Sequence, residues 1–209
     1  MAKLFFIYGT MGSSKSSLLI CKNHSYKEKG KKTLIIKPTT DTRNGAFTHG
    51  QMGTTCSRPI PEGPECLFLD SGKFSDLPNF ITVEDLDIIF VDESQFCKKE
   101  DVYYLSDVVD DLGIPVMCYG LKTTAEGDLF EGSATLLAIA DELEETIGIC
   151  DCGRRATHHI RLSGGKYLAG NAGCESDDVK YESCCRRCFK KHLRAQGIIG
   201  ANEVYKKNK

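Results

Sequence analysis

The segment from Lys3 to Leu19 constrains the fold of this chain more than any other part of the sequence. It begins with a run of apolar residues, Leu4 to Tyr8, of the aromatic and branched types that suit a buried parallel strand. A turn rich in glycine and serine, Gly9 to Ser14, follows, and Lys15-Ser16 then leads into an apolar helical face. A strand, a phosphate-binding turn and a helix in this order predict an α/β domain with a parallel sheet.

The turn follows the phosphate-binding pattern G-x-x-x-x-G-K-[ST], with Ser14 in place of the second glycine. In such a loop, backbone N–H groups and the helix N-terminus surround a polyphosphate, the lysine reaches the outer phosphates and the hydroxyl binds Mg²⁺. Serine adopts a positive φ less readily than glycine, and a polar turn with a surface lysine is the alternative interpretation. The predicted nucleotide-binding residues of the loop are Gly9, Thr10, Met11, Gly12, Ser13, Ser14, Lys15 and Ser16.

Two adjacent acids, Asp92 and Glu93, follow a second buried strand, Ile88 to Val91. Parallel strands deliver such residues to the carboxyl edge of an open sheet, where α/β proteins bind their ligands. The pattern therefore predicts that Asp92 holds Mg²⁺ and that Glu93 accepts a proton from an attacking hydroxyl. The alternative is a negative charge at the start of a following helix. The upstream phosphate loop favours the roles of metal ligand and base.

Further elements alternate along the first 148 residues. We expect helices over 16–29, 98–112 and 133–143, and strands over 33–36 and 115–121. The polar segment 39–63, which contains Arg43, is long enough to be a functional loop. These elements predict a first domain, 1–148, that resembles P-loop NTPases, with helices flanking a parallel sheet.

The cysteines indicate a different kind of structure in the last third. Six of the eleven lie between residues 150 and 188, and the other five are scattered and interpreted as small buried thiols. The pairs Cys150-x-Cys152 and Cys185-x-x-Cys188 are typical of a zinc ribbon, with a hairpin expected over 157–162 and 166–168. This predicts a zinc-ribbon domain over 149–191 and a basic, partly disordered tail over 192–209. The alternatives left open are Cys184 in place of Cys185 and Cys174 as a ligand, while His158 and His159 are expected to be structural or surface residues.

Composition excludes several classes of protein. The chain is 41% hydrophobic and 27% charged, as in ordinary globular proteins, and its net charge of −2 gives no reason to expect nucleic acid as a partner. No apolar run approaches the roughly 18 residues of a membrane span, and the N-terminus lacks the pattern of a signal peptide. A cytoplasmic location without membrane contact is therefore expected.

The order of loop, acids and ribbon resembles the type II thymidine kinases, the cellular and phage-type family, from about Lys3 to Lys191. The stretches that carry the resemblance are Lys37-Pro38 with Asp41-Thr42-Arg43, Val91 to Phe96, Val116 to Leu121, Leu129 to Ser133, Ile149 to Arg154, and Tyr181-Glu182-Ser183-x-Cys185.

The resemblance implies transfer of the γ-phosphoryl of ATP to the 5′-hydroxyl of thymidine in nucleotide salvage, with catalytic Mg²⁺ and structural Zn²⁺. It implies that Glu93 is the catalytic base, that Arg43 stabilises the transition state, and that Asp92 and Gln95 belong to the ATP and metal site. It also implies a homotetramer and a lasso loop, 165–181, over the thymine. The implied nucleoside-binding residues are Met11, Phe96, Leu121, Phe130 and Tyr181, and the implied zinc ligands are Cys150, Cys152, Cys185 and Cys188.

The chain departs from the family pattern near the nucleoside. Ala125-Glu126 replaces an aromatic residue followed by arginine, and Ser176-Asp177 replaces two glycines of the lasso. These departures suggest weakened recognition of the base, and they motivate the alternative of an inactive binding or regulatory subunit. A further alternative, suggested by Arg186-Arg187 and the basic tail, is a P-loop ATPase whose zinc ribbon touches nucleic acid; the net charge places it last.

Overall fold

The computed structural model describes residues 1–39, 49–51, 64–164, 166–167 and 179–195. The strands are β1 (Leu4–Gly9), β2 (Thr33–Pro38), β3 (His49–Gln51), β4 (Glu65–Leu69), β5 (Ile88–Val91), β6 (Val116–Leu121), β7 (Glu142–Thr146), β8 (Gly148–Ile149), β9 (Arg155–Ala156), β10 (His158–Ser163), β11 (Lys166–Tyr167) and β12 (Val179–Cys184). The helices are α1 (Lys15–Glu28), α2 (Lys99–Leu112), α3 (Glu131–Ile139) and α4 (Arg186–Ala195), with 3₁₀ helices at Phe74–Asn79, Val83–Asp85 and Ser94–Phe96.

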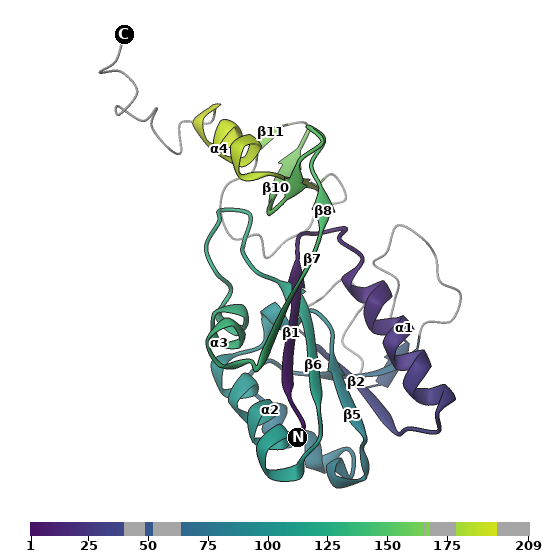
Figure 1. Ribbon diagram of the computed structural model, residues 1–209. Coiled ribbons are helices and arrows are strands. Elements are labelled where there is room, and N and C mark those ends of the chain that lie inside the picture. The colour runs from purple at the N-terminus through teal and green to yellow at the C-terminus, as the bar shows by residue number, and fades with distance from the viewer. Residues whose placement is uncertain (40–48, 52–63, 165, 168–178, 196–209) are drawn as a thin grey trace.

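A seven-stranded sheet in the order β3-β4-β2-β5-β6-β1-β7 forms the body of the molecule (Figure 1). The six strands from β4 to β7 in this order are parallel, and β3 pairs antiparallel with β4 at one edge. The inner strands consist largely of buried apolar residues, as expected for a sheet that is covered on both faces. The α/β fold with a parallel sheet is confirmed.

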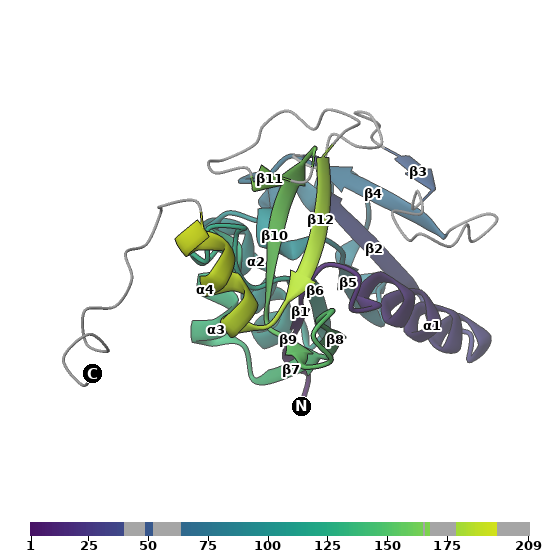
Figure 2. The ribbon, with the colours of Figure 1, turned by 90° about the horizontal axis from the view of Figure 1, so that it is seen from above.

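Helices cover the two faces of this sheet and divide the core in two (Figures 1 and 2). On one face, α2 and α3 contribute Val102, Leu105 and Leu136 to a cluster with alternate residues of β1, β5 and β6. On the other face, Leu19 of α1 packs with the intervening residues of these strands. Because side chains alternate across a strand, each strand supplies both cores.

Two expectations for the larger sheet differ from the structure. The helix predicted over 133–143 ends at Ile139, and Glu142–Thr146 instead form β7, which pairs in parallel with β1. The carboxylate of Asp141 accepts a hydrogen bond from the backbone N–H of Leu4 at 2.8 Å, which fixes the start of this pairing. The segment expected as one loop over 39–63 contains the short strand β3, which pairs with β4.

A smaller unit lies beyond the carboxyl ends of the sheet strands (Figure 1). It contains the three-stranded sheet β11-β10-β12, the two-stranded sheet β8-β9 and α4, around a small core that includes Ile160, Phe189 and Leu193. The predicted hairpin is therefore present as β10 and β11. β12 adds a strand that was not predicted, and α4 runs past residue 191 to Ala195. Within the described part of the chain, no helix combines the length and apolarity that crossing a membrane requires.

Candidate functional site

The predicted phosphate loop joins β1 to α1 at the carboxyl edge of the sheet. Gly12 and Ser14 both have positive φ, 70° and 65°, so the position that lacks the motif's glycine does have the conformation that favours glycine. At Gly9 there is no room for a side chain, since a Cβ atom would lie 2.1 Å from Oγ1 of Thr146. The loop is therefore held closely against the end of β7.

Polar contacts within the loop position its lysine. Nζ of Lys15, the first residue of α1, donates to the carbonyl oxygen of Thr10 at 2.7 Å. The hydroxyl of Ser13 also donates to this oxygen at 2.8 Å and lies 2.7 Å from Oγ1 of Thr146, which donates to the carbonyl of Tyr8. The loop, the helix start and β7 thus form one hydrogen-bonded unit, with the ammonium group inside the turn.

Asp92 lies at the end of β5, beside the start of α1. Oγ of Ser16 donates to Oδ1 of Asp92 at 3.2 Å, and Nζ of the buried Lys37 lies 3.9 Å from Oδ2. Burial, together with the neighbouring charge of Glu93, raises the pKa of Asp92 to about 7, and the positive charge of Lys37 opposes this. Oδ2 of Asp92 is buried and accepts no hydrogen bond from the described residues. A hydroxyl and a buried carboxylate oxygen at a phosphate loop fit the oxygen ligands that Mg²⁺ prefers.

Glu93 occupies a strained position immediately after Asp92, with φ of 53° and ψ of 38°. Nε2 of Gln95 donates to Oε2 of Glu93 at 2.6 Å, and Oε1 of Gln95 accepts from the backbone N–H of Leu121 at 2.9 Å. Gln95 is buried, so its amide links the end of β5 to the end of β6. Both ends of the amide are engaged by protein, and this arrangement orients the carboxylate of Glu93.

The five expected nucleoside-binding residues are distributed over the ends of β5 and β6, the start of α3, the phosphate loop and β12. The rings of Phe96 and Phe130 meet edge to face with centroids 5.8 Å apart, and the N–H of Leu121 is bound by Gln95. Met11 lies in the phosphate loop, and its carbonyl accepts a hydrogen bond from Ser183 of β12 at 2.5 Å. Tyr181 lies two residues before Ser183 on the same strand, and it is half-buried.

Some predicted residues fall outside the described part of the chain. These are Arg43, Cys174, Ser176 and Asp177, along with most of the lasso segment. Ala125 is described: it is buried, and its carbonyl accepts a hydrogen bond from the hydroxyl of Tyr167 at 3.1 Å. The loop that lacks the family's aromatic residue is therefore tied to the smaller unit by another aromatic side chain.

Four cysteine sulfur atoms gather in the smaller unit. The Sγ atoms of Cys150, Cys152, Cys185 and Cys188 all lie within 4.8 Å of one another. Those of Cys150 and Cys152 are 3.4 Å apart and those of Cys152 and Cys185 are 3.7 Å apart. A tetrahedral zinc site with Zn–S bonds of about 2.3 Å requires sulfur separations of roughly 3.8 Å, and disulfide bonds require about 2 Å. The cluster therefore fits Zn²⁺, and the fold is consistent with a zinc ribbon.

The pKa values and the positions of Cys184 and its neighbour Cys185 differ. Backbone N–H groups of Cys188 and Arg187 hold the pKa of Cys185 down at about 6, whereas burial raises the pKa of Cys184 to about 12. Cys184 lies outside the cluster, in the small core. Among the scattered cysteines, Cys66, Cys97 and Cys118 are buried as expected, but Cys21 is exposed on α1.

Sequence reasoning missed the contacts between the smaller unit and the phosphate loop. His159 of β10 is buried, and the desolvation of the ring, together with the positive charge of Lys15, lowers its pKa to about 4. Ser183 of β12 donates a hydrogen bond to the loop carbonyl of Met11. No local sequence pattern marks these residues, since they come together only when the strands are assembled.

Comparisons with known proteins identify relatives over nearly the whole chain. A family model described as thymidine kinase matches residues 2–189. A thymidine kinase of Rhodopirellula baltica is 41% identical over 196 residues, covering 92% of this chain and 90% of the relative. One of Mannheimia succiniciproducens is 41% identical over 91% of this chain and 96% of the relative, and one of Escherichia coli K12 is 36% identical over 99% of both.

Proposed function

This chain belongs to the thymidine kinase family, and from that premise we propose that it transfers the γ-phosphoryl group of ATP to the 5′-hydroxyl of thymidine. One observation supports the proposal above the others. A phosphate loop, a serine hydroxyl and a buried carboxylate meet at one edge of the sheet, with Ser16 and Asp92 in direct contact. A second acid, Glu93, is held beside them by Gln95.

The proposed reaction divides the work among a few side chains. The loop N–H groups and Lys15 bind the β- and γ-phosphates, and Ser16 and Asp92 would hold Mg²⁺. When bound, the metal neutralises charge on the phosphate oxygens. Glu93 takes the proton of the 5′-hydroxyl as the new O–P bond forms, the bond from the γ-phosphorus to the bridging oxygen breaks, and ADP leaves. We propose that Arg43, as the family resemblance implies, stabilises the transferring group.

The nucleoside is proposed to lie between the phosphate loop and the zinc ribbon. This placement is supported by the hydrogen bond from Ser183 of β12, the strand of Tyr181, to Met11 in the loop. Leu121 ends β6, and the rings of Phe96 and Phe130 meet after β5. The side chain of Ala125 cannot stack on a base as the family's aromatic residue would. Since an aromatic contact contributes about 0.5–1.5 kcal/mol beyond area burial, we expect weaker nucleoside binding than in relatives with the ring.

Three further parts of the proposal rest on the family resemblance. The domain division at about residue 148, a homotetramer and a role in cytoplasmic nucleotide salvage follow the family pattern. Structural Zn²⁺ at the four cysteines is supported by the sulfur geometry.

A coupled kinase assay with ATP, Mg²⁺ and a panel of deoxynucleosides tests the function. We expect the wild-type chain to phosphorylate thymidine, Glu93→Gln to lose at least a hundredfold in kcat, and the exposed control Glu84→Gln to retain activity. Ala125→Phe should lower the KM for thymidine. Wild-type protein with confirmed zinc and bound ATP that turns over no deoxynucleoside would refute the proposal. If Ala125→Phe also phosphorylates no deoxynucleoside, the alternative of a regulatory subunit is favoured.

A further inference from the structure

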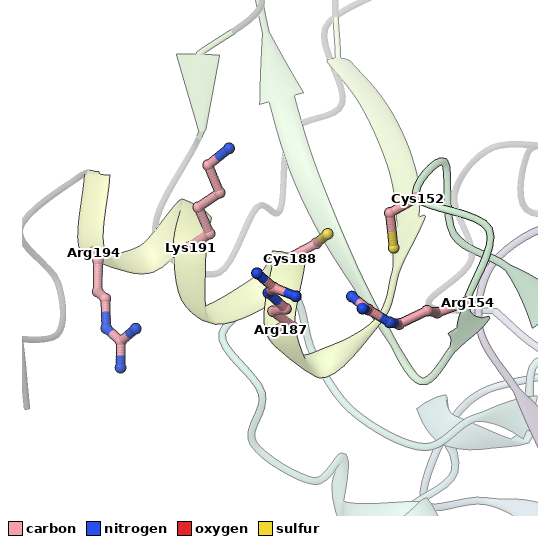
Figure 3. Close-up of a pocket in the computed structure, with 6 residues that line it drawn as sticks. All are labelled: Cys152, Arg154, Arg187, Cys188, Lys191 and Arg194. Carbon is pink, nitrogen blue, oxygen red and sulfur yellow. The ribbon is translucent and has the colours of Figure 1, made fainter. Parts of the chain in front are cut away.

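A basic pocket opens on the zinc ribbon, away from the phosphate loop. Its volume is about 610 Å³, and its lining residues are Cys152, Arg154, Arg187, Cys188, Lys191 and Arg194. Figure 3 shows Arg154, from the turn between β8 and β9, extending toward Arg187 on α4. Two like charges in one pocket repel each other unless an anion lies between them.

The cations of this pocket are not balanced by acidic side chains. Helix α4 has five exposed Lys or Arg residues and no acidic residue. Across the described ranges, none of the four lining cations has an ion pair with an acid. Arg186 and Arg187 also occupy the first turn of α4, where the helix dipole disfavours positive charge. Helix stability alone therefore does not explain these residues.

The negative charge of a zinc–thiolate cluster would balance only part of the positive charge of the pocket. Four thiolates with Zn²⁺ have a net charge of −2, and the described ribbon residues add two acids, Asp151 and Glu182. Arg154 and the five cations of α4 exceed these negative charges. The structure also gives Arg154 and Arg187 no hydrogen bond to a cysteine sulfur among the described residues. The pocket keeps a net positive charge beside the metal centre.

The form of the pocket indicates the kind of anion. Arg187, Lys191 and Arg194 follow one another at helical spacing, so their attachment points extend over about 10 Å of the α4 axis. That length suits several consecutive phosphates better than a single one. The lining has no aromatic ring on which a base stacks. We propose that this pocket binds the phosphodiester backbone of nucleic acid, through Arg154, Arg187, Lys191 and Arg194, without reading the base sequence.

This proposal revises the expectation drawn from net charge. A total of −2 describes the whole chain, whereas the structure concentrates positive charge on one face of the ribbon. Binding to that face would bring a nucleotide-producing enzyme to nucleic acid, and it does not depend on catalysis at the phosphate loop. Failure of the kinase assay and failure of this proposal are therefore separate results.

Fluorescence anisotropy with a labelled 20-base-pair DNA duplex tests the proposal on the full-length, zinc-loaded protein. With about four phosphates neutralised, log Kd should depend on log salt with a slope of magnitude about 3 to 4. The double variant Arg154→Gln/Arg187→Gln should bind at least about tenfold more weakly at low salt and reduce that slope by about 2. The control Lys27→Gln/Lys29→Gln makes the same change in net charge on exposed residues of the first helix region and should bind like wild type.

Zinc content is measured for every variant, because Arg154 and Arg187 lie close to the cysteines in sequence. If the first double variant loses zinc, Lys191→Gln/Arg194→Gln, which lies farther along α4, decides the question by the same criteria. Kinase turnover should be unchanged in all of these variants. No binding at low salt would overturn the proposal, and so would an equal loss in the lysine control or full affinity in both pocket variants.

Discussion

Ser14 is a residue whose backbone conformation costs free energy. Its φ of 65° and ψ of 20° lie in the left-handed region, at the position immediately before α1. An L-residue with a Cβ atom loses roughly 1–2 kcal/mol in this region. The motif prefers glycine at this position for that reason, and this chain keeps the loop geometry with a strained serine.

Replacing Ser14 by glycine should therefore stabilise the protein. Relief of strain exceeds the extra chain entropy of glycine, about 0.5–1 kcal/mol, and we expect a net gain of about 0.5–1 kcal/mol in the free energy of unfolding. Urea unfolding measures this value, and ATP affinity should be equal or higher. Gly12→Ala, at φ of 70° in open space, is the converse control and should destabilise by a similar amount. A loss of stability in Ser14→Gly would show that the serine side chain has a role of its own.

His159 makes stability depend on pH. Its pKa is lowered from 6.5 to about 4 because the ring is desolvated and lies near the positive charges of Lys15 and His158. Between these two values the unfolded chain binds more protons than the folded one, so stability falls as the pH decreases from about 6.5 to about 4. The contribution at the lower end is up to about 3 kcal/mol.

Comparison of wild type with His159→Val isolates this contribution from other titrating groups. Denaturant unfolding at several pH values between 4 and 7 should show that the variant loses less stability on acidification. Parallel curves for the two proteins would mean that the imidazole takes up its proton equally well in the folded state.

At the scale of elements, the secondary structure could be predicted for those segments whose local sequence pattern agrees with their final packing. The run from Leu4 to Ile20 combines an apolar strand, a loop motif and a helix start, and all three are present. The prediction of helix after Ile139 was wrong. The residues there favour helix locally, but the pairing of β7 with β1 and the contact from Asp141 to Leu4 decide their structure. Propensity is a weak guide where tertiary pairing opposes it.

The zinc ribbon should depend on its metal for folding. Its core consists of eight buried residues, and three of them are cysteines, which is too little apolar surface to stabilise a separate unit. Removal of zinc with a chelator should cause rapid hydrogen exchange across β10, β12 and α4, whereas β1, β5 and β6 stay protected. Exchange measured by mass spectrometry tests this, and restoring zinc should restore protection. Unchanged protection of the ribbon without zinc would contradict the prediction.

At the scale of the whole molecule, the ribbon is joined to the nucleotide side of the sheet at several points. Ser183 of β12 bonds to the carbonyl of Met11 in the phosphate loop, and Tyr167 of β11 bonds to the carbonyl of Ala125. The sequence predicted both units and the four cysteines, but it contains no signal for these contacts. They are single hydrogen bonds between residues far apart in the chain, and periodicity and spacing report only on local structure.

These contacts predict that zinc supports nucleotide binding from a distance. If the ribbon holds the phosphate loop through Ser183, then Ser183→Ala should weaken the free energy of ATP binding by about 1 kcal/mol. This loss raises the Kd for ATP about fivefold. Zinc removal should raise the Kd at least as much, because it releases all of β12. Isothermal titration with ATP and Mg²⁺ measures both, with Ser106→Ala on α2 as a hydroxyl-deletion control.

The decisive comparison combines the two changes. Once zinc is removed, the hydrogen bond from Ser183 to Met11 should no longer form, so Ser183→Ala should have no further effect on the Kd of the zinc-free protein. Two changes that act through one contact are not additive, whereas independent changes are. Equal fivefold effects of Ser183→Ala with and without zinc would show that the hydrogen bond to the phosphate loop forms independently of the metal. Unchanged ATP affinity in the zinc-free protein would show that the sheet alone holds the loop in its binding conformation.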